Sequence, residues 1–381
     1  MAADAVRRPP EELAGLTALR VPLIWWVVAY HVSMPGGWLD PDGWWWPLAR
    51  LLRSCLSVDI LFVLSGYLLA RVHWDIDRSQ AGRFLRTRAA RVLPMHLLGL
   101  LLCLPFVLAA GTYAPATLPL VLLCCGLCLQ AWIPAWALAI NPPSWYLSAD
   151  AFLCACFPVL QPAIRRLQSA PTCLGWLAVA WLLATIPCWL LSRTDPGLAA
   201  LPLERNHLAD GTLAHLVKFL PLVHLPEFIA GMLLCAWHRQ RAWRGDGRLL
   251  VPLGGGLLLG GIVAGAGVLP FAPALNGLFL PAACLLVLGL ADRRWSEGIL
   301  AHPAISLLGR SSFALFLLHT PVAMVAHALQ KRSDLLAALP DPAFGLLVLA
   351  AAQVFAIAAL RWVEEPLRRR LRPTRPAEVH R

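Results

Sequence analysis

Eleven apolar segments follow one another along the chain, separated by short polar connections. They lie at about 16–36, 45–71, 92–111, 115–133, 145–163, 172–192, 216–237, 249–268, 270–291, 303–328 and 341–363. Most are long enough for an α-helix to cross the ~30 Å hydrocarbon core of a bilayer. The pattern therefore predicts an all-α, polytopic membrane protein.

Arginine residues collect in only some of the polar connections, and this distribution predicts the topology. Arginine is concentrated in the stretches 7–8, 71–91, 165–166, 239–248, 293–294 and 368–381. Positively charged connections face the cytoplasm, so the chain must cross the membrane twice between 91 and 165, although three apolar segments lie there. We expect 115–133 to be a re-entrant or interfacial helix, leaving about ten transmembrane helices with both termini cytoplasmic.

Composition supports this class and excludes others. Hydrophobic residues make up 59% of the 381 positions and charged residues only 14%, and the mean hydropathy is +0.66. The net charge of +11 comes from short basic runs that orient helices, so no nucleic-acid partner is expected. Nearly all of the 11 cysteines lie in apolar runs, and we predict no metal site. With no organellar targeting features, the expected location is the bacterial inner membrane, as a multi-pass protein.

The apolar region forms one predicted domain with short flanking segments. Residues 1–15 are expected to be a cytoplasmic N-terminal segment, 16–366 the membrane domain and 367–381 a basic cytoplasmic tail. The first apolar run is followed by further spans rather than by a soluble domain, so we expect it to remain as the first span and not to be a cleaved signal peptide.

Ionisable residues inside the apolar segments mark the candidate functional site. Arg20 and His31 lie eleven positions apart on the first segment, about three helical turns and ~16 Å, so both occupy one helix face. Asp59, Asp150, Glu227 and His319 fall at comparable depths of other spans. Each is costly alone in hydrocarbon. Together, around a polar cavity, they could satisfy one another and hold a substrate.

Seven local strings, in order along the whole chain, resemble the acyltransferase-3 family of integral-membrane O-acyltransferases. They are LTALRVPLIWWVVAYH, SVDILFVLSGYLLA, FLRTRAARVLPMH, PPSWYLSADAFLCACFP, LPEFIAGMLL, LLGRSSFALFLLHTPV and RWVEEPLRRRLR. One departure concerns the fourth string, where Asp150 and Ala151 stand in place of the one or two glutamates common in the family. The acidic group is retained, with a side chain shorter by one methylene.

The resemblance implies transfer of an acyl group, by default acetyl, from acyl-CoA to a hydroxyl of a cell-surface or exopolysaccharide carbohydrate. His31 is the expected general base, because an imidazole can take a proton from a hydroxyl and return it to a thiolate. Asp59 or Asp150 would orient it. The residues expected to bind the phosphates of coenzyme A are Arg20, Arg86, Arg88 and Arg91, since guanidinium groups bind phosphate well. Those expected at the acceptor are Trp145, Glu227 and His319.

Other interpretations stay open on the sequence. Arg20 could anchor its helix at the headgroups, and His319 could pack near Pro321 instead of lining a cavity. Ser65 and Gly66 are expected to be helix-packing residues, as is Gly231. The acceptor could be a natural product or a glycolipid. Buried His, Asp and Glu in about ten spans would also suit a proton-coupled transporter or glycan exporter.

Overall fold

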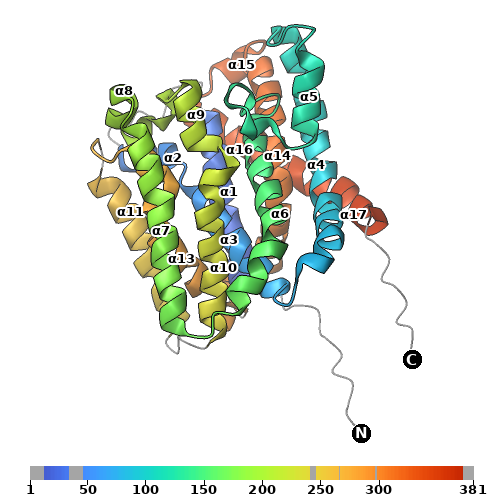
Figure 1. The fold of residues 1–381 in the computed structure, drawn as a ribbon. Helices are drawn as coiled ribbons and strands as arrows, with labels where there is room; N and C mark the ends of the chain where they lie inside the picture. The colour runs from blue at the N-terminus through green and yellow to red at the C-terminus, as the bar shows by residue number, and fades with distance from the viewer. Residues whose placement is uncertain (1–12, 34–45, 241–245, 266, 297, 372–381) are drawn as a thin grey trace.

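The computed structural model describes residues 13–33, 46–240, 246–265, 267–296 and 298–371, and over these ranges the protein is a bundle of helices without β-strands (Figure 1). Nine helical stretches in this part of the chain are long and apolar enough to cross a membrane, and a bent pair of helices brings the number to ten. The predicted all-α, multi-pass architecture is confirmed. The predicted flanking segments 1–15 and 367–381 lie mostly outside the described residues.

Seventeen α-helices are found in the described ranges. They are α1 (Ala14–Ser33), α2 (Trp46–Ser54), α3 (Ser57–Val72), α4 (Ala81–Ala110), α5 (Leu118–Gly126), α6 (Trp145–Arg165), α7 (Ala170–Ser192), α8 (Pro196–Ala200), α9 (Gly211–Phe219), α10 (Leu225–Arg239), α11 (Leu250–Ala264), α12 (Phe271–Pro273), α13 (Leu280–Leu290), α14 (Pro303–Gln330), α15 (Asp334–Ala337), α16 (Asp341–Ala359) and α17 (Glu365–Leu371).

Three apolar segments differ from uninterrupted spanning helices. The second is divided into α2 and α3, whose axes differ by 52°, at Cys55, where φ is 52° and the helix cannot continue. The α-helix in the segment 115–133 is α5, whose nine residues span about 14 Å, too short to cross a bilayer. A single 3-10 turn, Gln130–Trp132, follows it. The segment 270–291 is broken between α12 and α13, where Gly277 has φ 91°.

Helices α3 and α10 are packed against each other at backbone distance. A Cβ at Gly66 would overlap the carbonyl oxygen of Phe228, and a Cβ at Gly231 would overlap that of Val63. Each helix therefore presents a glycine where the other approaches, the arrangement by which small residues let membrane helices associate. Other extensive helix contacts join α1 to α14, α14 to α16, α10 to α7 and α11 to α13. The prediction that Gly66 and Gly231 serve packing is confirmed.

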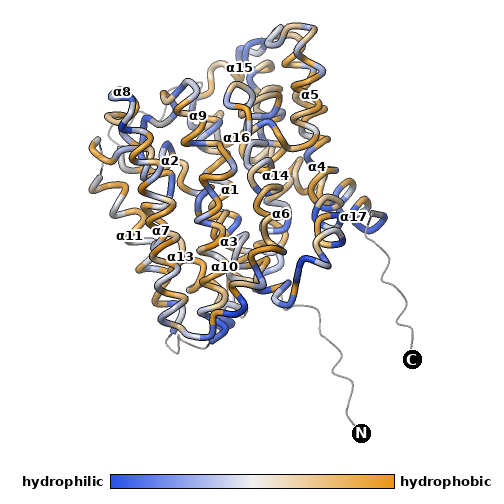
Figure 2. Tube along the Cα trace, in the orientation of Figure 1, coloured by the Kyte–Doolittle hydropathy of each residue, from blue (hydrophilic) through white to orange (hydrophobic). Residues whose placement is uncertain are grey.

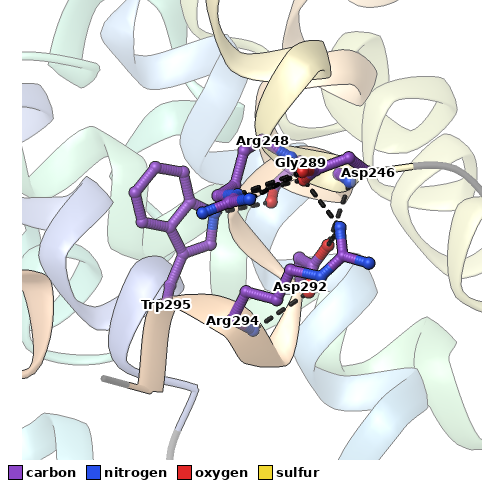
Figure 3. A network of polar contacts seen from close by, with 7 residues as sticks. Asp246, Arg248, Gly289, Asp292, Arg294 and Trp295 are labelled. Atoms are coloured by element: carbon purple, nitrogen blue, oxygen red, sulfur yellow. Dashed lines mark hydrogen bonds and ion pairs between the residues drawn. The ribbon is translucent and has the colours of Figure 1, made fainter. Parts of the chain in front are cut away.

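The arginine-rich connections after α3, α6 and α10 meet at one end of the bundle. Arg165 pairs with Asp75 at 3.6 Å, and the Arg239 guanidinium lies 4.4 Å from the centre of the Trp74 ring. At the same end, Asp246 pairs with Arg248 at 2.8 Å and with Arg294 at 2.9 Å (Figure 3). This common location is what the positive-inside rule requires. The assignment of this end to the cytoplasm stays a prediction.

The outer face of the bundle is apolar over much of its length, and hydrophilic positions concentrate toward the ends (Figure 2). Exposed side chains such as Leu101 on α4 and Trp176 on α7 are more than half accessible, as expected of residues that contact lipid. Helix α4 contains two prolines in its interior, Pro94 and Pro105. Each proline lacks the N–H that would complete the helical ladder.

Candidate active site

A cavity of about 290 Å³ lies between α1, α3, α4, α6 and α14. Its volume is at the lower end of the range for small-molecule sites. Most of its wall is apolar, with leucine, valine, isoleucine and phenylalanine side chains. Its charged lining side chains are Arg20, Arg88, Arg91 and Asp150. Four of the residues predicted from the sequence to act in the site therefore share one cavity.

Asp150 is held by three side chains from three helices. The Arg88 Nη2 atom donates to Asp150 Oδ2 at 3.2 Å, and the Ser65 hydroxyl donates to Oδ1 at 3.3 Å. The thiol of Cys154, one turn further along α6, lies 3.7 Å from Oδ2. Asp150 and Arg88 are only 10% and 22% exposed, so the ion pair is shielded from solvent. Its geometry fixes the position of Arg88 in the cavity wall.

The three guanidinium groups leave the cavity with an excess of positive charge. Arg20 and Arg88 repel Arg91, and Glu364, which lies outside the cavity lining, attracts it. Asp150 is the one carboxylate among the cavity's lining side chains. The Nε atom of Arg88 is buried and has no hydrogen-bond partner among the described residues. An anionic oxygen in the cavity would relieve the repulsion and accept from this donor. The arrangement suits phosphate or carboxylate binding.

His73 lies in the wall of the same cavity, just beyond the end of α3. Burial, reinforced by the nearby Arg88 guanidinium, lowers the pKa of His73 below its usual 6.5. The imidazole is therefore mainly uncharged at neutral pH. The positive potential of the cavity comes from the arginines, and it does not depend on His73 protonation near pH 7.

His31 and His319 form a pair of imidazoles on neighbouring helices, with ring centroids 5.1 Å apart. The Nδ1 atom of His31 donates to the Val27 carbonyl at 2.9 Å, and that of His319 to the Leu315 carbonyl at 3.2 Å. A carbonyl can only accept, so Nδ1 carries the proton in both rings. Each Nε2 then has a free lone pair, and that of His319 is buried without a partner among the described residues.

The two imidazoles lie beyond the inner end of the cavity, on the same helix faces as its walls. Ile24 and Phe316 line the cavity. His31 follows Ile24 by two helical turns on α1, and His319 follows Phe316 by one turn on α14. The Phe316 ring lies 6.4 Å from that of His319 and 5.3 Å from that of Tyr146, another lining residue. Two aromatic rings thus stand between the arginines and the histidines.

The remaining predicted site residues lie elsewhere. Asp59 and Glu227 are grouped around His224, and Trp145 packs against the same imidazole at 5.3 Å between ring centroids. Arg86 is exposed and donates to the Gly82 carbonyl at 3.2 Å. Among the described residues, no carboxylate forms a hydrogen bond or ion pair with His31. The roles predicted for Asp59, Glu227, Trp145 and Arg86 stay predictions.

Ser65, Tyr146 and Phe316 are among the lining residues that were not singled out for the site from the sequence. Ser65 was expected only to pack helices, yet its hydroxyl contacts Asp150. A serine in the middle of an apolar helix gives no local signal for such a contact. Tyr146 and Phe316 belong to aromatic-rich strings that are equally typical of lipid-facing helices. Only the spacing of Tyr146 and Asp150, one turn apart, indicates a shared face.

Comparison with known proteins agrees with the architecture. Residues 13–361 match the family model described as "Acyltransferase domain". The chain is 27% identical over 338 residues to "Acyltransferase MdmB" of Streptomyces mycarofaciens, which covers 84% of this chain and 82% of the relative. No solved structure matches the chain. Because the family match extends over nearly all of the described helices and the relative aligns over most of both sequences, the chain belongs to the acyltransferase-3 family and is a membrane acyltransferase.

Proposed function

We propose that the enzyme transfers an acyl group, acetyl by default, from acyl-CoA to a hydroxyl of a cell-surface or exopolysaccharide carbohydrate at the bacterial inner membrane. The observation that supports the donor is the meeting of Arg20, Arg88 and Arg91 in one otherwise apolar cavity. Guanidinium groups bind phosphate oxygens through paired hydrogen bonds. The apolar wall suits the uncharged arm that carries the thioester. The carbohydrate acceptor rests on the family resemblance.

The dimensions of the site fit a thioester that reaches the histidine pair. Arg20 and His31 are ~16 Å apart along α1. The pantetheine arm between the phosphates and the sulfur of coenzyme A has about thirteen bonds, equivalent to roughly four extended residues or ~14 Å. With phosphates at the arginines, the arm would follow the apolar wall past Tyr146 and Phe316. The acyl carbon would then lie close to His31 and His319.

In the proposed reaction, His31 Nε2 accepts the proton of the acceptor hydroxyl as the hydroxyl oxygen attacks the thioester carbon. The C–O bond forms, the C–S bond breaks, and the imidazolium returns the proton to the thiolate to give free coenzyme A. The Val27 carbonyl, which accepts from Nδ1–H, keeps the reactive lone pair on Nε2 and stabilises the imidazolium. His319 could accept the same proton, since its Nε2 is also unprotonated.

Acyl release from radiolabelled acetyl-CoA tests this proposal. Purified enzyme in lipid nanodiscs is compared with His31→Gln and, as a control, His327→Gln, a histidine further along α14. We expect His31→Gln to lower the rate at least 100-fold while coenzyme A still binds, because general-base catalysis contributes about 10²–10⁴. His327→Gln should retain the wild-type rate. Equal rates in all three proteins would refute the role of His31, and absence of coenzyme A binding in the wild type would refute the donor.

A further inference from the structure

Asp59, His224 and Glu227 form a second cluster, on the face of α3 that is turned away from the active-site cavity. One ligand atom from each lies within 4.8 Å of the other two. Asp59 belongs to the first turn of α3 and Glu227 to the first turn of α10. His224 immediately precedes α10. The acyl transfer proposed above makes no use of this cluster.

The hydrogen bonds of His224 define which of its atoms faces the carboxylates. Its Nε2 lies 3.2 Å from the Lys218 carbonyl oxygen and must donate to it. In the neutral ring the Nδ1 atom then carries a lone pair, and it faces Glu227 Oε2 at 3.2 Å. Two acceptors at this distance need either a shared proton or a metal cation between them. Histidines that bind metals commonly donate their second N–H to a backbone carbonyl in this way.

The carboxylates also have oxygen atoms without partners. Glu227 is completely buried, and its Oε1 has no hydrogen-bond partner among the described residues, nor does the buried Oδ2 of Asp59. Both residues, but not His224, line a small separate cavity of about 10 Å³, whose other lining residues are Gly277 and apolar side chains. This space is about that of one water-sized sphere. It would admit a single small ion and exclude an organic ligand.

The N-terminal ends of three helices lie around the two carboxylates. Each acid lies in the first turn of its helix, and the N-terminal turn of α13, which begins at Leu280, borders the same small cavity. Helix N-termini stabilise negative charge. Two carboxylates and a neutral imidazole lone pair are ligands typical of a divalent transition metal, above all Zn²⁺.

We propose that Asp59, His224 and Glu227 bind one divalent metal ion of the Zn²⁺ type. Ligands of tetrahedral zinc lie ~3.4 Å apart, given bonds of about 2.0–2.1 Å. His224 and Glu227 already have that spacing, and the Asp59 carboxylate has to move toward them by ~1 Å. The ion would join α3 to α10 behind the active-site cavity. Its role is structural, because α3 separates it from the arginines and carries Ser65 on the other face.

The metal content of the purified protein tests the proposal independently of acyl transfer. The full-length enzyme, with its affinity tag removed, is equilibrated with ZnCl₂ in lipid nanodiscs, dialysed and analysed by mass spectrometry for zinc. We expect about one zinc per chain in the wild type and a loss of it in Asp59→Asn and Glu227→Gln. Glu204→Gln is the matched control, because Glu204 is also a buried carboxylate but accepts from the Gly267 amide and lies near Arg50. It should retain the metal.

A second measurement keeps the result decisive if a variant does not fold. Wild-type enzyme is loaded with Co²⁺, and its visible absorption and thermal unfolding are recorded before and after a chelator. We expect a ligand-field absorption band that disappears when the chelator is added. We also expect the chelator to lower the unfolding midpoint and added Zn²⁺ to restore it. A wild type that binds neither Zn²⁺ nor Co²⁺ would overturn the proposal and leave a carboxyl–imidazole cluster held by a shared proton. Metal retained in Glu227→Gln would also overturn it.

Discussion

The Arg88–Asp150 ion pair provides a quantitative test of the active-site geometry. The pair combines a 3.2 Å Nη2–Oδ2 contact with side-chain exposures of 22% and 10%. Removing one partner of a fully buried pair costs about 3–5 kcal/mol, and a hydrogen bond to a charged group contributes about 1.5–3 kcal/mol. Because Arg88 retains some solvent contact and Asp150→Asn can still accept from Ser65, we expect a coupling free energy near ~2 kcal/mol.

A double-mutant cycle measures this coupling. The free energy of unfolding is determined by denaturant titration in mixed micelles for the wild type, Asp150→Asn, Arg88→Gln and the double variant. The coupling is the difference between the double-variant effect and the sum of the single effects. The matched control is the Arg165–Asp75 pair, which has a similar separation of 3.6 Å but exposures of 38% and 78%. That cycle should give less than ~1 kcal/mol.

The two cycles distinguish a shielded pair from an ordinary surface pair. Couplings of equal size, or a coupling below ~0.5 kcal/mol at Arg88–Asp150, would refute the reasoning that burial and geometry make this pair strong. Salt offers a further check within the same experiment. Added NaCl should reduce the coupling of the exposed control pair more than that of the shielded pair, because solvent-exposed charges are screened more effectively.

Three further predictions concern donor binding, helix packing and pH. Arg91→Ala should weaken coenzyme A binding about tenfold or more, whereas Arg83→Ala, at an exposed position of the same helix outside the cavity lining, should leave it unchanged; titration calorimetry measures both, and equal losses would contradict the site. Gly231→Val should destabilise the protein by about 1–3 kcal/mol, since its side chain would overlap the α3 backbone, and an unchanged unfolding midpoint would argue against this packing. Hydrogen bonds from Arg248 hold the pKa of Asp246 well below its usual range, so this carboxylate stabilises the folded state above its usual pKa, about 4, and less at lower pH. The difference in unfolding midpoint between wild type and Asp246→Asn at pH 7 should therefore shrink as the pH falls below about 4, and a constant difference would contradict the assignment.

Much of the fold could be predicted from the sequence because hydrocarbon imposes a simple rule. A lipid-facing helix must be apolar along its length, so hydropathy locates the spans. Arginine placement then indicates that one of the three apolar segments between 91 and 165, taken as 115–133, does not cross. The break at Cys55 was not predictable, since no glycine or proline marks it and its left-handed backbone depends on tertiary packing. The break at Gly277 was not predictable either, because the apolar run around it predicts one continuous helix.

The site was predictable only in part, for a different reason. Depth along each span can be estimated from residue number, and on this basis Asp59 was the favoured neighbour of His31, with Asp150 as the alternative. The rotation of each helix about its axis is set by contacts between segments that are distant in the sequence. The depth of a residue in the membrane gives no information about these contacts. The structure turns Asp150 toward Arg88 and Asp59 toward His224. In the structure, the side chain packed beside His31 from another helix is the imidazole of His319.

Pro94 follows Arg91 by three positions inside α4 and leaves the carbonyl of Ala90 without its usual intrahelical donor. The N-terminal turns of α4, which carry Arg88 and Arg91, are thus connected to the rest of the helix through fewer backbone hydrogen bonds. A hinge at this point would let the guanidinium groups close on a nucleotide and release it after each turnover. Helix α3, packed closely against α10 at Gly66 and Gly231, would meanwhile keep its wall of the cavity fixed.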